Sequence, residues 1–428
     1  MTELTGERSL SPFLALYYSR VFPYDDFCGW LSYNRHVSFP NREFVFDCGI
    51  EGTHEHLSFS DAVALKNKLR RLRPDKIEVG AVFSAPPRHI GNLPVEKEFV
   101  LDIDLANYNH VRHCCAGNNE REVCHDCYKL LTLGMRIIDR SLRIEHGFNH
   151  ILWVYHTRHM YAWVCDKKAR YLPNSYRQEL INRLQHSHFF RSMKAKGRSF
   201  NSGLLSESIQ RALSDIRPRF QQILMQQNLF EDAPNKMSHL MCIMPNLTVG
   251  RDVHSLIRSL EGRDSCEKFT ELTKMIRSKV EMGIPEWVNH SRLMDEILIW
   301  YAYPRMNQNV SISMCLPLIA PFTTKSNTGE IAIPIDIDWA KDMNPVNAPT
   351  IERVMEEVEL AIRNGHEVEV DTCLKPFLKI FREFLTNLFN SNDQQEDLPN
   401  NINYQEPNVD PPSNNQPKST DMRACHQQ

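Results

Sequence analysis

The sequence predicts an α/β (α+β) protein with a mixed sheet core and an inserted helical subdomain. Two observations carry this prediction. Before residue 172 and after residue 304, short apolar runs bounded by polar residues alternate with helical patterns, which is typical of a sheet covered by helices. Between residues 173 and 303, the apolar residues instead recur at the spacing of helices. We therefore predict one domain from 10–172 and 304–385, with 173–303 as a helical subdomain inserted into it.

The elements of the first part follow from local signals. Ser11 and Pro12 mark the start of a helix, and 60–74 reads as a basic amphipathic helix that Ser60 caps and Pro74 ends. The predicted strands are 42–48, 76–84, 98–105, 150–157 and 160–166.

The last part returns to the sheet domain. The runs 309–319 and 329–339 look like strands, and helices are expected near 350–364 and 374–389. Residues 391–428 are rich in Asn, Gln, Pro and Asp, which predicts a disordered tail.

Composition narrows the class of protein. The 428 residues are 42% hydrophobic, enough for a large core, and the net charge of -3 provides no overall field for nucleic acid or membranes. The sequence shows no apolar run of membrane-spanning length and no signal-peptide pattern at its start. A reducing compartment is expected, so the 12 cysteines are not predicted to form disulfides.

Two carboxylates interrupt the apolar strand EFVLDIDL. Asp102 and Asp104 are two residues apart, so they project from the same face of a strand and could together hold divalent cations. The alternative is an edge strand whose polar face meets water. Asp336 and Asp338 have the same spacing, but Pro334 just before them argues against a central strand and favours a turn or the entry to a helix.

Four cysteines lie in CCAGNNEREVCHDC. Cys114 and Cys115 precede a polar loop that leads to a C-x-x-C knuckle at Cys124 and Cys127, and such a set can supply four thiolates to a tetrahedral zinc ion. Four sulfur ligands leave no open position, so this zinc would be structural. His113 and His125 flank the cluster and are expected to be solvated.

Two basic segments could either bind nucleic acid or simply face solvent. HFFRSMKAKGRSF (188–200) mixes basic and aromatic residues, as a groove for single-stranded nucleic acid does, but a solvated linker explains it as well. The basic face of 66–76 reads as a solvated helix face.

The acid pair and the cysteines occur in an order that resembles a known family. The run EFVLDIDLANYNHVRHCC…CHDC is similar to the small, catalytic subunit of the archaeal–eukaryotic DNA primase, in particular its eukaryotic form. The similarity covers roughly residues 10–385, and the matching blocks include LYYSRVFPY (16–24), NREFVFD (41–47), KIEVGAVFS (76–84), GFNHILWVY (147–155), YPRMNQNVS (303–311) and TGEIAIPID (328–336).

The resemblance implies a function. Members of the family have the primase catalytic fold and make short RNA primers on single-stranded DNA from nucleoside triphosphates by two-metal nucleotidyl transfer. It implies Mg²⁺ or Mn²⁺ at Asp102 and Asp104, structural zinc at the four cysteines, a nuclear location, and association with the large primase subunit and the DNA polymerase α complex.

This chain departs from the family pattern at the third metal ligand. In YPRMNQNVS the position of the family's third carboxylate is Asn307, whose amide oxygen brings no charge. Charge-assisted bonds are worth roughly 1.5–3 kcal/mol each, so cation binding should weaken.

The nucleotide-binding positions depart as well. Where the family has Ser-Gly-x-Arg-Gly-x-His, this chain has HTRHMYA, in which Arg158 matches loosely and His159 resembles a displaced histidine. Glu43 matches, whereas Ile319 and Lys325 stand where a lysine and a histidine are expected. The remaining departures are Glu55 in place of an arginine and Glu78 in place of an aspartate.

These departures leave two hypotheses. The chain is either a primase small subunit with a degraded active site or a catalytically inactive paralogue that acts as a scaffold or regulatory subunit.

Overall fold

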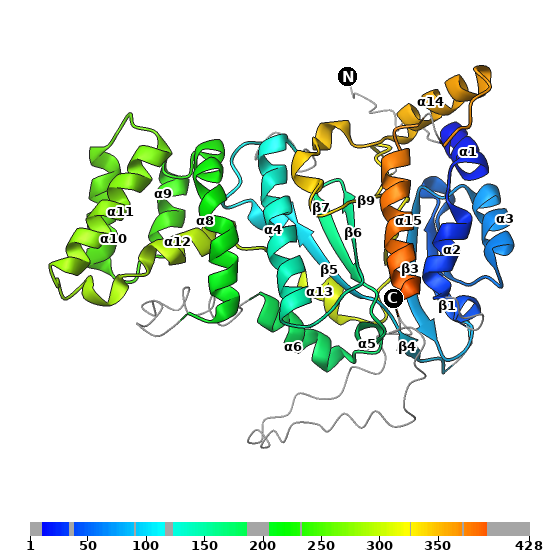
Figure 1. The fold of residues 1–428 in the computed structure, drawn as a ribbon, viewed down its shortest axis with the longest axis horizontal. Helices are drawn as coiled ribbons and strands as arrows, with labels where there is room; N and C mark the ends of the chain where they lie inside the picture. The colour runs from blue at the N-terminus through cyan, green and yellow to red at the C-terminus, as the bar shows by residue number, and fades with distance from the viewer. Residues whose placement is uncertain are drawn as a thin grey trace.

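The computed structural model describes residues 11–33, 38–89, 91–115, 123–185, 205–231, 233–325, 327–369 and 372–391 (Figure 1). The predicted basic–aromatic segment 188–200 and the predicted tail from residue 392 onward lie outside these ranges. In the part that the structure describes, no helix is both apolar enough and long enough to cross a membrane.

The strands form two antiparallel sheets. The first has the order β2-β1-β3-β4, with β8 also paired to β3, and the second has the order β5-β7-β6-β9. The strands are β1 (Arg42–Asp47), β2 (Thr53–Leu57), β3 (Lys76–Phe83), β4 (Pro94–Glu96), β5 (Phe99–Asp104), β6 (Ile151–His156), β7 (His159–Val164), β8 (Leu318–Ile319) and β9 (Ile333–Pro334). The predicted α/β class is therefore confirmed.

Helices cover both sheets and continue beyond them. In the sheet region they are α1 (Ser11–Arg20), α2 (Tyr24–Ser32), α3 (Ala62–Leu72), α4 (His125–Ile144), α5 (Lys167–Arg170), α6 (Asn174–Leu184), α13 (Gln308–Ile312), α14 (Ile351–Arg363) and α15 (Lys375–Asn390). The others are α8 (Glu207–Gln227), α9 (Pro234–Met241), α10 (Leu247–Ser259), α11 (Ser265–Glu281) and α12 (Leu293–Ala302), which gather at one end of the molecule (Figure 1).

The long helix α4 connects the second sheet to the helical end. It contacts β5 and β7 on one side and α8 on the other, as Figure 1 shows. Trp153 of β6 donates from its indole N–H to Asp139 of α4 at 3.0 Å. Arg140 of α4 pairs with Asp215 of α8 at 3.1 Å. The helical end is thus attached to the sheet that carries the acid pair.

Three local predictions were wrong in whole or in part. The run 329–339 was expected to be a strand, but within it only Ile333–Pro334 is one. The run 309–319 was expected to be a strand, but Gln308–Ile312 is helical and only Leu318–Ile319 pairs as a strand. The cap of α3 is Asp61, whose carboxylate accepts from the Ala64 N–H at 2.8 Å, and not Ser60. Both residue types cap helices, so the sequence alone could not choose between them.

The predicted turn after β9 is present. The Asp336 carboxylate accepts from the backbone N–H groups of Asp338 and Trp339 at 2.9 and 3.1 Å, which is the pattern of an Asx turn.

Candidate functional site

Asp102 and Asp104 lie at the end of β5, and both are buried, with 2% and 8% of their surface exposed. In the antiparallel register, Asp102 lies opposite Tyr161 and Asp104 opposite His159 of β7. β5 is an edge strand of its sheet, as the alternative expected, but its two acids are buried and do not face water. Their burial has to be compensated by partners, because an unpaired buried carboxylate is costly.

The partners come from the hairpin that joins β6 to β7. His159 Nδ1 lies 2.9 Å from Asp102 Oδ1, and Arg158 Nε lies 3.0 Å from Asp104 Oδ1. The Asp104 carboxylate also accepts from the Ala106 N–H at 2.9 Å. Both acids thus have a basic partner supplied by the chain itself.

The hairpin loop is tight and strained. His156 pairs with His159, which leaves only Thr157 and Arg158 in the loop, and Thr157 has φ of 56°. A β-branched residue at positive φ is disfavoured, and such conformations cost about 1–3 kcal/mol. Glycine would adopt this conformation without strain.

Asn307 lies next to the acid pair through its backbone. Its N–H donates to the Asp102 carbonyl at 2.9 Å, and Met306 forms an isolated antiparallel bridge with Ile103. Asn307 precedes the first residue of α13. The position predicted from the sequence as the third ligand is therefore brought beside the first two.

A cavity of about 300 Å³ adjoins the hairpin. Arg158, His159, Ile319 and Lys325 line it, so the structure brings these four predicted positions together. Glu43 is not part of this lining. It lies on β1, where His56 Nδ1 is 2.6 Å from its carboxylate and where burial raises its pKa.

Four further residues line this cavity, Lys76, His156, Thr157 and Thr324, and the sequence predicted no role for any of them. Lys76 begins β3, and its ammonium lies 3.2 Å from the Glu78 carboxylate. Burial lowers the pKa of His156 to about 3, so this imidazole is neutral at neutral pH. The pairing of Glu78 with Ile319 brings β3 to this place, and this long-range register has no local signal.

The four cysteines meet in one cluster. The ligand atoms of Cys114, Cys115, Cys124 and Cys127 all lie within 4.8 Å of one another. Neighbouring sulfurs are 3.5 to 3.8 Å apart, close to the edge of about 3.8 Å of a tetrahedron with zinc–sulfur bonds of about 2.3 Å. The donor set therefore fits a zinc ion.

Two helices hold the cluster in place. Cys124 and Cys127 lie at the start of α4. Gln227, at the end of α8, accepts through Oε1 from the N–H groups of His113 and Cys114 at 2.7 and 3.1 Å. His113 is half-buried and not fully solvated as predicted, and this burial lowers its pKa to about 4.

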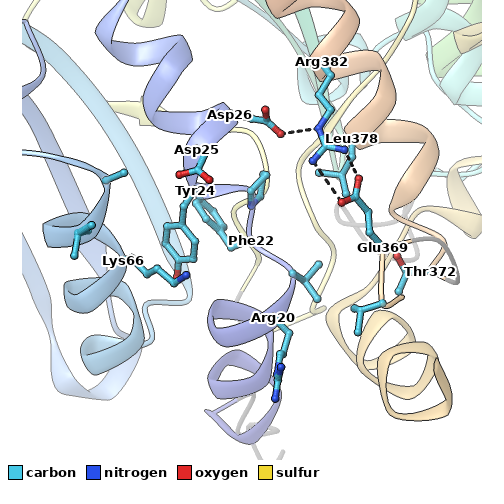
Figure 2. A pocket seen from close by; sticks show the side chains of 15 residues that line it. Arg20, Phe22, Tyr24, Asp25, Asp26, Lys66, Glu369, Thr372, Leu378 and Arg382 are labelled. Atoms are coloured by element: carbon cyan, nitrogen blue, oxygen red, sulfur yellow. Dashed lines mark hydrogen bonds and ion pairs between the residues drawn. The ribbon is translucent and has the colours of Figure 1, made fainter. Parts of the chain in front are cut away.

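A second cavity, of about 430 Å³, lies between α2, α3 and the segment joining α14 to α15 (Figure 2). None of the predicted site residues lines it. Figure 2 shows Arg382 between Asp26 and Glu369, and it pairs with both. Because these charges satisfy one another, we assign no ligand to this cavity.

Comparisons with known proteins identify the family of this chain. The family model described as DNA primase small subunit matches residues 101–337, more than half of the chain, and its range includes the acid pair, the cysteine cluster and Asn307. The chain therefore belongs to the DNA primase small subunit family.

Individual relatives extend the similarity over most of the chain. The chain is 30% identical to the DNA primase small subunit of Drosophila melanogaster over 367 residues, which is 82% of each protein. It is 28% identical to that of Schizosaccharomyces pombe over 83% of this chain and 80% of the relative. With the protein of Saccharomyces cerevisiae it shares 26% identity over 87% of this chain and 90% of the relative.

Proposed function

We propose that this chain acts as a primase small subunit that makes short RNA primers from nucleoside triphosphates on single-stranded DNA, with reduced turnover. The observation that carries the proposal is the buried pair Asp102 and Asp104 beside a cavity lined by cationic side chains. Carboxylates and cations are the groups that nucleotidyl transfer from a triphosphate requires.

The acid pair suits Mg²⁺ or Mn²⁺. These cations prefer carboxylate oxygens, and when bound they would activate the attacking hydroxyl and neutralise charge on the triphosphate. Asp102 and Asp104 would hold them, and Asn307 would add a neutral amide oxygen. The lost negative charge is our reason for expecting slow turnover.

The cavity suits the triphosphate. Lys76, Arg158 and Lys325 line it, so their charges would attract and orient the phosphates next to the acids. Arg158 also pairs with Asp104, and this contact would align the cavity with the acid pair.

Primer synthesis on poly(dT) with ATP and Mn²⁺ or Mg²⁺ tests the proposal. We expect oligoribonucleotides above the level of an Asp102→Ala control. An Asn307→Asp variant restores the third carboxylate and should raise the rate at least about tenfold, since charge-assisted ligation is worth about 1.5–3 kcal/mol. No product above the control from either the parent chain or Asn307→Asp would refute this proposal.

A second candidate is a non-catalytic subunit. The observation that favours it is that hairpin side chains already pair with both carboxylates, while the third position is neutral. On this hypothesis the chain would bind nucleotide weakly but still assemble with a large primase subunit. Tight, Mn²⁺-dependent triphosphate binding in calorimetry would contradict it.

The partners and cellular location of this chain are inferred from its family. We infer that the chain pairs with a large primase subunit, and through it with DNA polymerase α, in the nucleus. Co-purification with a co-expressed large subunit tests the first step. The domain division predicted above would allow the zinc-bearing sheet domain to carry the reaction, with 173–303 as a separate helical subdomain.

A further inference from the structure

A groove of about 1090 Å³ lies in the helical end of the molecule, and neither acid of the pair lines it. It is bounded by α10, by the connection from α9 to α10, by Trp300 of α12 and by His110, which follows β5. We call it the α10 groove. Small-molecule sites typically measure about 300–1,000 Å³, so its size suits a larger occupant.

The apolar part of the α10 groove is open and adaptable. Met241, Met244 and Leu247 line it, and 80% of Leu247 is exposed. Gly250 leaves space between them, because a Cβ there would lie 3.6 Å from Met244 Cβ and 3.9 Å from Met241 Sδ. Flexible thioethers that can rearrange are common at surfaces that bind peptides.

The charged part is entirely positive. Arg251 and Arg305 line the α10 groove, and no aspartate or glutamate occurs among the described residues that line it. Arg305 donates to the Trp300 carbonyl, while its buried Nε has no hydrogen-bond partner within the described ranges. The charge complement of this groove is therefore acidic.

Two kinds of macromolecule carry negative charge and could occupy a groove with this positive and apolar lining: a nucleic-acid strand and an acidic peptide. A single strand needs exposed aromatic rings on which its bases stack. Trp300 is the one Phe, Tyr or Trp among the described lining residues, and only 7% of it is exposed because His110 packs against it and Arg305 covers it. The accessible apolar lining is aliphatic and thioether, which favours peptide side chains.

We propose that the α10 groove binds an acidic peptide segment of a protein partner, with apolar side chains that insert between Met241, Met244 and Leu247. Its carboxylates pair with Arg251 and Arg305. None of these residues belongs to the acid pair or lines its cavity, so the proposal does not rest on the proposed primer synthesis.

Selection from a random peptide library tests the proposal. A phage library of 16-residue peptides is panned against the full chain, with counter-selection against Leu247→Asp/Arg251→Glu. Both replaced side chains are exposed, so the fold should persist. We expect enriched peptides with net negative charge and at least two apolar residues. Fluorescence anisotropy should show at least tenfold weaker binding to the double variant, and weaker binding at high salt.

Matched controls separate this result from general effects. Met282→Asp/Arg277→Glu makes the same changes at exposed positions of the helical end that do not line the groove, and it should bind like the parent chain. Gly250→Met fills the groove without changing charge and should also weaken binding. Triphosphate binding and primer synthesis should be the same in all these variants.

Several outcomes would overturn the proposal. One is enrichment of basic or uncharged peptides, or no enrichment over the double variant. Another is equal binding of the selected peptides to both double variants. If (dT)20 instead loses affinity only in Leu247→Asp/Arg251→Glu, the groove is a nucleic-acid surface.

Discussion

The cysteine cluster and the acid pair differ in how complete they are. The cluster presents four sulfurs at spacings that fit zinc. The acid pair presents two carboxylates and one amide, and both carboxylates are already paired with Arg158 and His159. Within one chain, the ligands for an ion that would stabilise the fold can therefore be complete while the ligands for the ions of the reaction are not.

The largest expected effect lies at the complete site. Cys127→Ser removes a buried cysteine sulfur at the start of α4, so the zinc content of the purified chain should fall from about one ion towards zero. The free energy of unfolding should fall by about 4 kcal/mol or more. Metal analysis and thermal unfolding measure both quantities.

Cys242→Ser, at an exposed position outside the cluster, is the control and should change neither quantity. If the parent chain holds no zinc after purification under reducing conditions, the cluster is not a zinc site and the comparison fails.

A smaller effect is expected at the contact between the cluster and α8. Gln227→Ala leaves the N–H groups of His113 and Cys114 without their acceptor. Groups that orient metal-binding segments typically contribute about 10- to 100-fold to affinity. Competition with a chelator should therefore show weaker zinc binding, with Gln222→Ala on the exposed face of α8 as control. If the two variants bind zinc with equal affinity, Gln227 does not help to orient the cysteine loop.

The smallest effect is expected at the incomplete site. Arg158→Ala removes the partner of Asp104, so the free energy of unfolding should fall by about 1 kcal/mol in the absence of divalent cations. Mn²⁺ should stabilise this variant more than the parent chain, because the carboxylate is then free to bind the ion.

Thermal unfolding with and without Mn²⁺ measures how much the ion stabilises each variant. Arg353→Ala, which breaks an exposed ion pair with Glu357 on α14, should respond to Mn²⁺ like the parent chain. If Arg158→Ala responds like this control, then Arg158 does not compete with cations at Asp104.

Local pattern was sufficient for much of the fold. The predicted strands 42–48, 76–84 and 98–105 became β1, β3 and β5, because alternating or continuous apolar residues specify a strand within a few positions. The prediction of a strand over 309–319 was wrong because a short apolar run has no clear period. The conformation at its two ends depends on tertiary contacts, of Asn307 with Asp102 and of β8 with β3.

The sequence by itself determined the identities and spacing of Asp102, Asp104 and the four cysteines, since neighbouring residues in a strand or knuckle need no distant partner to be placed together. Only the tertiary structure decided that Arg158 and His159 pair with the acids and that Lys76 joins their cavity. It also decided that Gln227 holds the cysteine loop. These contacts join residues far apart in the chain, and their geometry depends on strand register and helix packing, which no local pattern specifies.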